Sequence, residues 1–172
     1  NTRARLLAED GRIRRIVNNY EWISFNFGPT LLAWMEQAMP EDYAAILAAD
    51  ARSVREQNGH GNALAQVFNH TILPLASEAD KRLQIEWGLA DFRHRFGREP
   101  DGMWLAETAA DVPTLEALAA AGIRFTLLAP RQAWSVCDLT DAGHPNDRWD
   151  EVREAIDPTQ AYRCFLPSGA TI

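Results

Sequence analysis

The stretch Asp101-Gly-Met-Trp-Leu-Ala-Glu-Thr-Ala109 is the most informative part of the sequence. Residues 102–106 are apolar and predict a short buried strand, and Glu107 follows this strand directly. In α/β folds, ligands bind just beyond the carboxyl ends of parallel strands, so Glu107 occupies the position of a catalytic acid. A helix-capping or merely solvated Glu is the alternative, although the strand-end position and the neighbouring Trp104 speak for function.

The residues that follow predict a helix and a second strand. Residues 113–121 are strong helix formers with Pro113 in the first turn, and Gly122 provides a C-terminal stop. Residues 123–128 are again apolar, which is typical of a strand. A strand, a helix and a strand within roughly 30 residues indicate a βαβ unit with a parallel pair of strands. The sequence therefore predicts a fold of the α/β class.

Similar patterns occur along the rest of the chain. Further strands, parallel to the two above, are predicted at 21–27 and 162–166, and further helices at 30–39, 41–57, 78–96 and 150–156. The helix at 78–96 has a good N-cap in Ser77 and a good stop in Gly97. Its predicted buried stripe consists of Leu83, Trp87, Phe92 and Phe96.

Two other segments carry weaker signals. Near the N-terminus, Ile13, Ile16 and Val17 alternate with arginines in a predicted strand or turn, and they are expected to contact the core. Residues 129–159 are poor in pattern and predict a long excursion from the domain. An excursion of that length is usually a lid or a binding element.

Composition and charge narrow the range of functions. The 172 residues suit one domain, 1–172, and 47% of them are hydrophobic, as in an ordinary globular protein. The net charge of -7 argues against a nucleic-acid partner, because phosphate binding needs a basic surface. No apolar run approaches the length of a membrane span, so no membrane partner is expected.

The cysteines indicate a cellular compartment, and the two ends of the chain indicate a fragment. Cys137 and Cys164 lack a metal-binding spacing, which fits a reducing, cytoplasmic compartment, with a chance disulfide as the alternative. No metal or cofactor is predicted. The N-terminus has no signal-peptide pattern. The chain begins at Asn1 rather than Met and ends at Ile172 within an apolar run, so we expect a fragment of a longer protein.

Polar residues that interrupt apolar runs suggest a binding site. They are Trp22, Ser24, Asn26, His60, Asn62, Gln66, Asn69, His70, Trp104 and Glu107. If the strands are parallel, these residues are expected to converge on one rim of a barrel-like sheet. Aromatic faces stack on sugar rings, and amides, imidazoles and carboxylates pair with hydroxyls, so the set suits a carbohydrate. The alternatives are that His60 only holds its turn and that His70 is a core histidine.

Retaining cleavage of a glycosidic bond requires two carboxyl groups about 5–5.5 Å apart. Glu107 can supply the first. Asp101, Asp111, Asp138 and Asp141 are available as partners, but none follows a convincing strand. We therefore expect the second carboxyl group to lie beyond the chain end and the fragment to be inactive alone.

Four ordered motifs resemble glycoside hydrolase family 57, in particular its alpha-amylase/alpha-mannosidase-like branch. These motifs lie at residues 18–34, 59–66, 68–75 and 102–108. The resemblance implies an incomplete (β/α)7-type barrel, truncated at both ends, and retaining hydrolysis or transfer on α-linked glucans. The family's His-Gln-Pro-type motif is absent and is expected upstream of Asn1, and the family's acid/base Asp is expected beyond Ile172.

The resemblance also implies roles for individual residues. Glu107 in the Trp-Leu-x-Glu motif would be the catalytic nucleophile, and Trp104 would bind substrate. His70 would face the same cleft, while a substrate-binding role for His60 and Asn62 follows more loosely. One alternative function is a metal-dependent polysaccharide deacetylase-like barrel, which needs an Asp and two His around its metal. Another is a non-catalytic carbohydrate-binding fragment.

Overall fold

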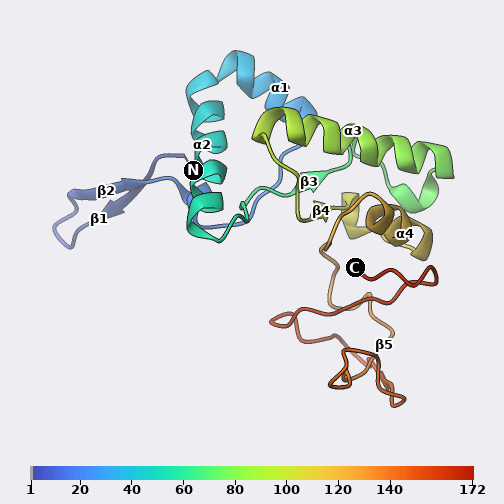
Figure 1. Ribbon diagram of the computed structural model, residues 1–172. Helices are drawn as coiled ribbons and strands as arrows, with labels where there is room; N and C mark the ends of the chain where they lie inside the picture. The colour runs from blue at the N-terminus through green and yellow to red at the C-terminus, as the bar shows by residue number, and fades with distance from the viewer. Residues whose placement is uncertain (1) are drawn as a thin grey trace.

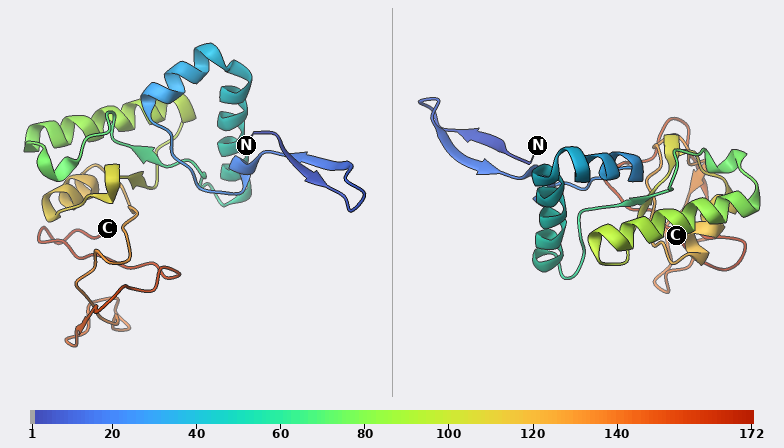
Figure 2. Two further views of the ribbon diagram at one scale, coloured as in Figure 1. Left: turned by 180° about the vertical axis from the view of Figure 1, so that it is seen from behind. Right: turned by 90° about the horizontal axis from the view of Figure 1, so that it is seen from above.

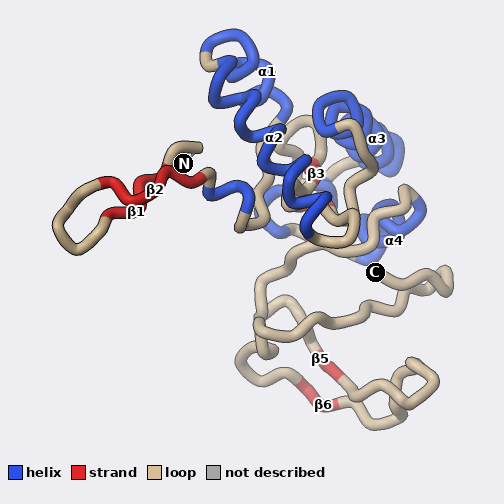
Figure 3. The backbone as a smooth tube through the Cα atoms, turned by 60° about the vertical axis from the view of Figure 1, so that its left-hand side comes forward, coloured by secondary structure: helices blue, strands red, loops and turns tan. Residues whose placement is uncertain are grey.

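A computed structural model describes residues 2–172 (Figure 1). A hairpin projects from one side, helices form the middle of the molecule, and the residues after the last helix extend away as loops (Figures 1 and 3). The elements in order are β1 Ala4–Leu7, β2 Ile13–Val17, η1 Asn19–Glu21, α1 Pro29–Ala38, α2 Pro40–Glu56, β3 Ala65–Gln66, η2 Leu73–Leu75, α3 Glu78–Phe96, β4 Met103–Trp104, η3 Ala106–Thr108, α4 Val112–Ala120, β5 Ser135–Val136 and β6 Asp150–Glu151.

The centre of the fold is a short series of parallel segments. Strands β3 and β4 pair in parallel, with Ala65 opposite Met103. Single parallel bridges extend the series on both sides, from Phe25 to Ala63 and from Gly102 to Phe125. Four successive segments of the chain are therefore neighbours, with helices between them. This confirms the mixed α/β class and the parallel βαβ unit, although the regular strands are shorter than predicted.

Four predicted elements differ from the structure. The strand predicted at 123–128 is reduced to Phe125, which alone bridges to Gly102. Residues 19–21 form a 3-10 helix, because the Asn18 side chain accepts the Tyr20 N–H at 3.1 Å, so only Phe25 of the predicted strand 21–27 pairs. The segment 162–166 is antiparallel to the chain end, because a turn at Gly169, with φ of 87°, folds the chain back. The predicted helix at 150–156 is replaced by β6 and a backbone bond from Val152 to Trp134.

The four long helices are confirmed. Helix α3 begins and ends at the predicted residues, with Ser77 accepting the Asp80 N–H at 3.2 Å and Gly97 in the left-handed conformation. Helix α4 is capped by Asp111, which accepts the Thr114 N–H at 2.8 Å. Helices α1 and α2 each begin at a proline, whose fixed φ suits the first helical position.

Helix α3 lies against β3 along a face that matches the predicted stripe only in part: Phe92 is buried and Phe96 packs against the core, as predicted. The buried residues of the helix include Ile85, Leu89 and Phe92, whereas Leu83 and Trp87 are 37% and 45% exposed. The reason is Gly88: a Cβ built there would lie only 2.1 Å from the Gln66 carbonyl oxygen. Ile85 and Phe92, about one turn before and after Gly88, face the core with it. Leu83 and Trp87 point away from this contact.

The β1–β2 hairpin stands away from the core (Figure 2). Its expected core residues Ile13 and Ile16 are 51% and 56% exposed, so that prediction is wrong. The two strands pair only with each other, and no third layer covers them among residues 2–172.

The residues after α4 form the long excursion predicted from the sequence. Between residues 129 and 159 the regular structure consists of the short antiparallel pair β5–β6. Cys137 and Cys164, both in this C-terminal part, are free thiols. Within the described residues, no helix combines the length and apolarity that a bilayer crossing requires.

Candidate active site

Two groups of polar residues flank the parallel strands. Because β3 and β4 run in the same direction, the residues that follow them share one edge and the residues that precede them share the other. We call these the C-terminal edge, which carries residues 68–70 and 107–108, and the N-terminal edge, which carries residues 60–62 and 101.

The C-terminal edge unites three of the predicted site residues. His70 Nε2 lies 2.8 Å from Glu107 Oε1, and the two side chains are 56% and 66% exposed. The His70 ring also packs beside Trp104, with ring centroids 5.6 Å apart. Glu107, His70 and Trp104 come from two different strand ends, so their proximity depends on the parallel pairing of β3 and β4.

The backbone at Glu107 is strained. Glu107 has φ of 58° and ψ of 19°, and Thr108 has φ of 52°. Among residues 2–172, Asn58 is the only other non-glycine residue with a positive φ. A left-handed conformation costs an L-residue roughly 1–2 kcal/mol, and such residues cluster at functional sites. Two consecutive strained residues therefore mark this turn as more than a connection between β4 and α4.

Gln132 holds the strained turn from outside. Its side-chain amide donates to the Thr108 carbonyl at 2.7 Å, and its side-chain oxygen accepts the Ala129 N–H at 2.6 Å. The start of the long excursion is thereby bonded to the turn that carries Glu107. No sequence pattern indicates this role, because Gln132 lies in a segment without periodicity and bonds to a residue 24 positions away.

Helix α3 supports the segment that carries His70. The Gln84 side chain accepts the Asn69 N–H at 2.8 Å, and the Gln84 backbone carbonyl accepts the Phe68 N–H at 3.1 Å. Phe68 also packs edge-on against Trp87, with ring centroids 5.7 Å apart. Helix α3 therefore holds Phe68 and Asn69, the two residues that precede His70.

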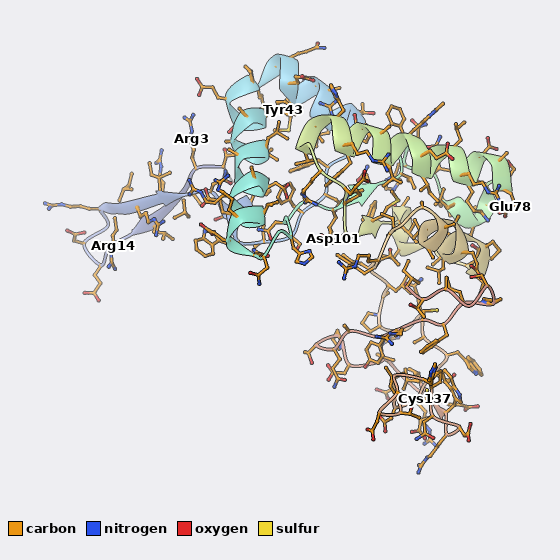
Figure 4. The ribbon with its side chains drawn as sticks, in the orientation of Figure 1. Arg3, Arg14, Tyr43, Glu78, Asp101 and Cys137 are labelled. Atoms are coloured by element: carbon orange, nitrogen blue, oxygen red, sulfur yellow. The ribbon has the colours of Figure 1, made fainter. Side chains whose placement is uncertain are left out.

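The N-terminal edge carries a second histidine–carboxylate pair. His60 Nδ1 lies 3.0 Å from Asp101 Oδ2, and Arg124 donates to the other carboxylate oxygen at 3.2 Å. Burial raises the pKa of Asp101, but the hydrogen bond from His60 and the charges of His60 and Arg124 together lower it below its usual range. Figure 4 labels Asp101, which precedes β4.

Asn62 lies on the same edge and is buried. Its side-chain oxygen accepts from Gln57 at 3.1 Å, and its amide nitrogen donates to the Tyr20 carbonyl at 3.1 Å. The predicted convergence of all polar residues on one rim is therefore wrong, because His60 and Asn62 precede β3 while His70 follows it. The substrate-binding role of His60 and Asn62 stays a prediction.

A buried ion pair fixes the N-terminal edge to α2. Arg98 donates to both carboxylate oxygens of Asp50, at 2.8 and 2.9 Å, and also to the Ala63 carbonyl at 2.9 Å. Asp50 in turn accepts the Ala63 N–H at 2.7 Å. Gly61 is required beside this pair, since a Cβ there would lie 2.2 Å from the Arg98 guanidinium. Sequence patterns did not reveal this pair, whose members are 48 positions apart.

The other carboxylates considered as partners of Glu107 lie elsewhere. Asp111 caps α4; burial raises its pKa, but hydrogen bonds from Thr114 and the charge of Lys81 lower it. Asp138 and Asp141 are exposed in the long excursion. Within residues 2–172, no three His, Cys, Asp or Glu side chains are grouped closely enough to hold a metal ion.

The C-terminal edge combines the chemical groups that sugar chemistry needs. An exposed carboxylate can attack an electrophilic carbon, and a neighbouring imidazole can orient that carboxylate through a hydrogen bond. An indole at the same place offers an apolar face to a sugar ring.

Comparisons with known proteins identify one family and a relative with a known name. Residues 12–136 match glycosyl hydrolase family 57. Over 114 residues the chain is 28% identical to alpha-amylase 1 from Dictyoglomus thermophilum, a match that covers 66% of this chain and 16% of that protein. The chain thus spans less than a fifth of the length of this curated relative.

Three solved structures are similar to parts of the chain. The 4-alpha-glucanotransferase from Thermococcus litoralis has 25% identity and a TM-score of 0.49, over 65% of this chain and 17% of that one. A GH57 branching enzyme from Thermococcus kodakaraensis, in complex with glucose, has 28% identity and a TM-score of 0.29, over 40% and 13%. The alpha-amylase AmyC from Thermotoga maritima has 16% identity and a TM-score of 0.37, over 66% and 28%.

Proposed function

The chain belongs to glycosyl hydrolase family 57, and we propose that it is part of the catalytic domain of a retaining glycoside hydrolase or glucanotransferase that acts on α-linked glucans. Glu107 is the nucleophile, and Trp104 and His70 belong to the same substrate site. The observation that carries this proposal is the strained, strand-end carboxylate of Glu107 in contact with His70 and next to Trp104.

The proposed reaction follows from the position of this carboxylate. Glu107 Oε attacks the anomeric carbon of the sugar while the glycosidic oxygen leaves with a proton from a second carboxyl group. Water or a sugar hydroxyl then displaces Glu107, and the second group takes the proton back. His70 keeps the Glu107 carboxylate in the attacking orientation.

We further propose that residues 1–172 are one partial catalytic domain of an incomplete (β/α)7-type barrel. The support is the repeated connection of neighbouring parallel segments by helices: α1 and α2 lie between Phe25 and Ala63, α3 between β3 and β4, and α4 between β4 and Phe125. In barrels of this kind, catalytic residues occupy the C-terminal ends of the strands, which is where Glu107 lies.

The second carboxyl group is proposed to lie outside this chain. Asp101 is engaged at the N-terminal edge, and Asp111 is engaged as the cap of α4. We therefore expect negligible turnover by the 172 residues alone, because general acid catalysis contributes about 10²–10⁴-fold.

The test is an assay on α-glucans of the 172-residue chain and of a version extended at both ends, each with Glu107→Gln. The matched control is Glu99→Gln, since Glu99 is an exposed surface carboxylate paired with Arg93. We expect turnover by the extended protein that Glu107→Gln abolishes and Glu99→Gln preserves, with an α-configured first product. Full activity of Glu107→Gln would refute the assignment. Turnover by the short chain would place the acid/base within it, with Asp138 and Asp141 as first suspects.

The deacetylase alternative would need His60 and His70 around one metal ion. They instead pair with different carboxylates at the two edges of the strands, which speaks against that alternative. Acetate release from an acetylated polysaccharide, measured with and without a chelator, tests it directly, since a metal-dependent deacetylase would release acetate only in the absence of the chelator.

A further inference from the structure

A pocket of about 380 Å³ opens at the N-terminal edge. Its lining includes Ser24, Gln57, His60, Asp101, Arg124 and Phe125. This volume lies in the range of roughly 300–1,000 Å³ that is typical of small-molecule sites. The pocket does not include Glu107, His70 or Trp104, so it is separate from the candidate active site.

The charges in the pocket favour a neutral ligand. The Asp101 carboxylate is paired with Arg124 and with His60, so neither a bare anion site nor a bare cation site is left. The pocket still offers hydrogen bonds of both kinds, because His60 uses only one ring nitrogen for Asp101 and Gln57 uses only its amide nitrogen for Asn62. A neutral ligand rich in hydroxyl groups matches this mixture of donors and acceptors.

An aromatic ring forms the apolar part of the pocket. Phe125 is 40% exposed. Its ring lies directly against Gly102, where a Cβ would come within 2.4 Å of the ring. Only glycine leaves room for the ring in this place. The apolar face of a sugar ring packs on such an exposed aromatic face.

The pocket is held rigidly from behind. Asn62 is buried with both side-chain groups bonded, and the bidentate pair between Arg98 and Asp50 holds the adjoining Ala63 through its N–H and its carbonyl. A preorganised site loses less conformational entropy on binding than a flexible one.

We propose that this pocket is a second carbohydrate site, which binds one or two sugar units of an α-glucan at the edge opposite Glu107. The proposal rests on the proposed function for the choice of sugar. The site holds the glucan without cleaving it, because both oxygens of its carboxylate are already bonded, one to His60 and one to Arg124.

The test is a titration of the ¹⁵N-labelled 172-residue chain with maltose, followed by the NMR shifts of its backbone amides. Shifts around residues 60–62 and 124–125 are expected, with a dissociation constant of their own. Phe125→Leu, which keeps an apolar side chain, should weaken this binding about three- to tenfold, the worth of one aromatic contact. Arg124→Ala, at a 70% exposed side chain, tests the polar side of the pocket without risk to the core. Trp104→Leu is the matched control at the other edge.

The outcomes separate this inference from the proposed function. Shifts confined to the surroundings of Trp104 and His70 would overturn the second site and leave the proposed function standing. Shifts at the N-terminal edge support the second site if Phe125→Leu or Arg124→Ala weakens the binding that causes them and Trp104→Leu does not. Additional shifts at the C-terminal edge do not change this conclusion. An absence of shifts at both edges, or equal weakening by all three substitutions, would overturn it.

Discussion

The two edges of the same short strands carry similar residues in different states. Each has a histidine within 3.0 Å of a carboxylate. At the N-terminal edge, Asp101 is also bonded to the cationic side chain of Arg124, and the Asp101 side chain is only 26% exposed. At the C-terminal edge, Glu107 is 66% exposed, and its backbone adopts a conformation that costs free energy.

This difference separates a carboxylate that stabilises the fold from one that is available for chemistry. Both oxygens of Asp101 are bonded, one to His60 and one to Arg124, so it is a poor nucleophile. Glu107 keeps its charge accessible, and its strained turn is maintained by contacts from elsewhere, such as the two hydrogen bonds of Gln132. Similar residue pairs therefore have different uses, and the surroundings decide which use each pair has.

The largest expected effect concerns the buried pair behind the N-terminal edge. Asp50→Ala leaves Arg98 buried without its partner, and it should lower the free energy of unfolding by about 3–5 kcal/mol. Asp50→Asn, which keeps the shape and part of the hydrogen bonding, should cost less. Urea unfolding of the 172-residue chain measures both. If Asp50→Ala lowered the free energy of unfolding by less than about 1 kcal/mol, the ion pair would not hold the N-terminal edge rigidly.

The second effect concerns the orientation of Glu107. In the extended enzyme, His70→Ala should lower kcat/KM about 10–100-fold, as removal of a supporting hydrogen bond does at other sites. His70→Gln, which can still donate an N–H, should restore part of the activity. His94→Ala, at an exposed helix position, is the control. Equal activities of the Ala and Gln variants at position 70 would show that His70 does not act through this hydrogen bond.

The third effect concerns the strain itself. Thr108→Gly removes the steric penalty of the positive φ, whereas Thr108→Ala keeps it, so the glycine variant should be more stable than the alanine variant by about 1 kcal/mol. Thermal and urea unfolding of the two variants give this difference. If the alanine variant were the more stable one, the turn would not be strained in solution.

The smallest effect concerns Asp101 and pH. Its pKa is lower in the folded chain than in the unfolded chain, so the unfolded chain binds more protons in the acidic range between the two pKa values. The stabilisation is therefore complete above the ordinary pKa of an Asp and is lost as the pH falls through that value to the folded one. Urea unfolding at several acidic pH values should show a shallower pH dependence for Asp101→Asn. An unchanged dependence would contradict the pairing.

The sequence predicted the helices well because their signals are local. Ser77, Gly97 and Pro113 act within a few residues of themselves, so α3 and α4 begin and end close to the predicted positions. The apolar run 102–106 likewise indicated the region of β4, although the strand ends at Trp104 and Glu107 lies in the 3-10 helix that follows.

The remaining features depend on contacts between distant residues. The apolar run around β3 did not reveal where the strand lies, so the sequence could not tell that His60 precedes it and His70 follows it. Gln132 and Arg98 find their partners 24 and 48 positions away, and no periodicity encodes such pairs. The segment 162–166 was apolar enough for a parallel strand, but the turn at Gly169 turned it into a hairpin.

Gly88 has a consequence for how this sequence can change over generations. With a Cβ position only 2.1 Å from the Gln66 carbonyl, every substitution there would push α3 away from β3. A scan of all single substitutions, selected for folded protein, should therefore find position 88 intolerant while its exposed neighbour Trp87 accepts many residues. Helix α3 also holds the segment that precedes His70 through Gln84. Substitutions on the exposed surface of this helix are therefore tolerated, whereas a substitution at its one glycine would displace the C-terminal edge.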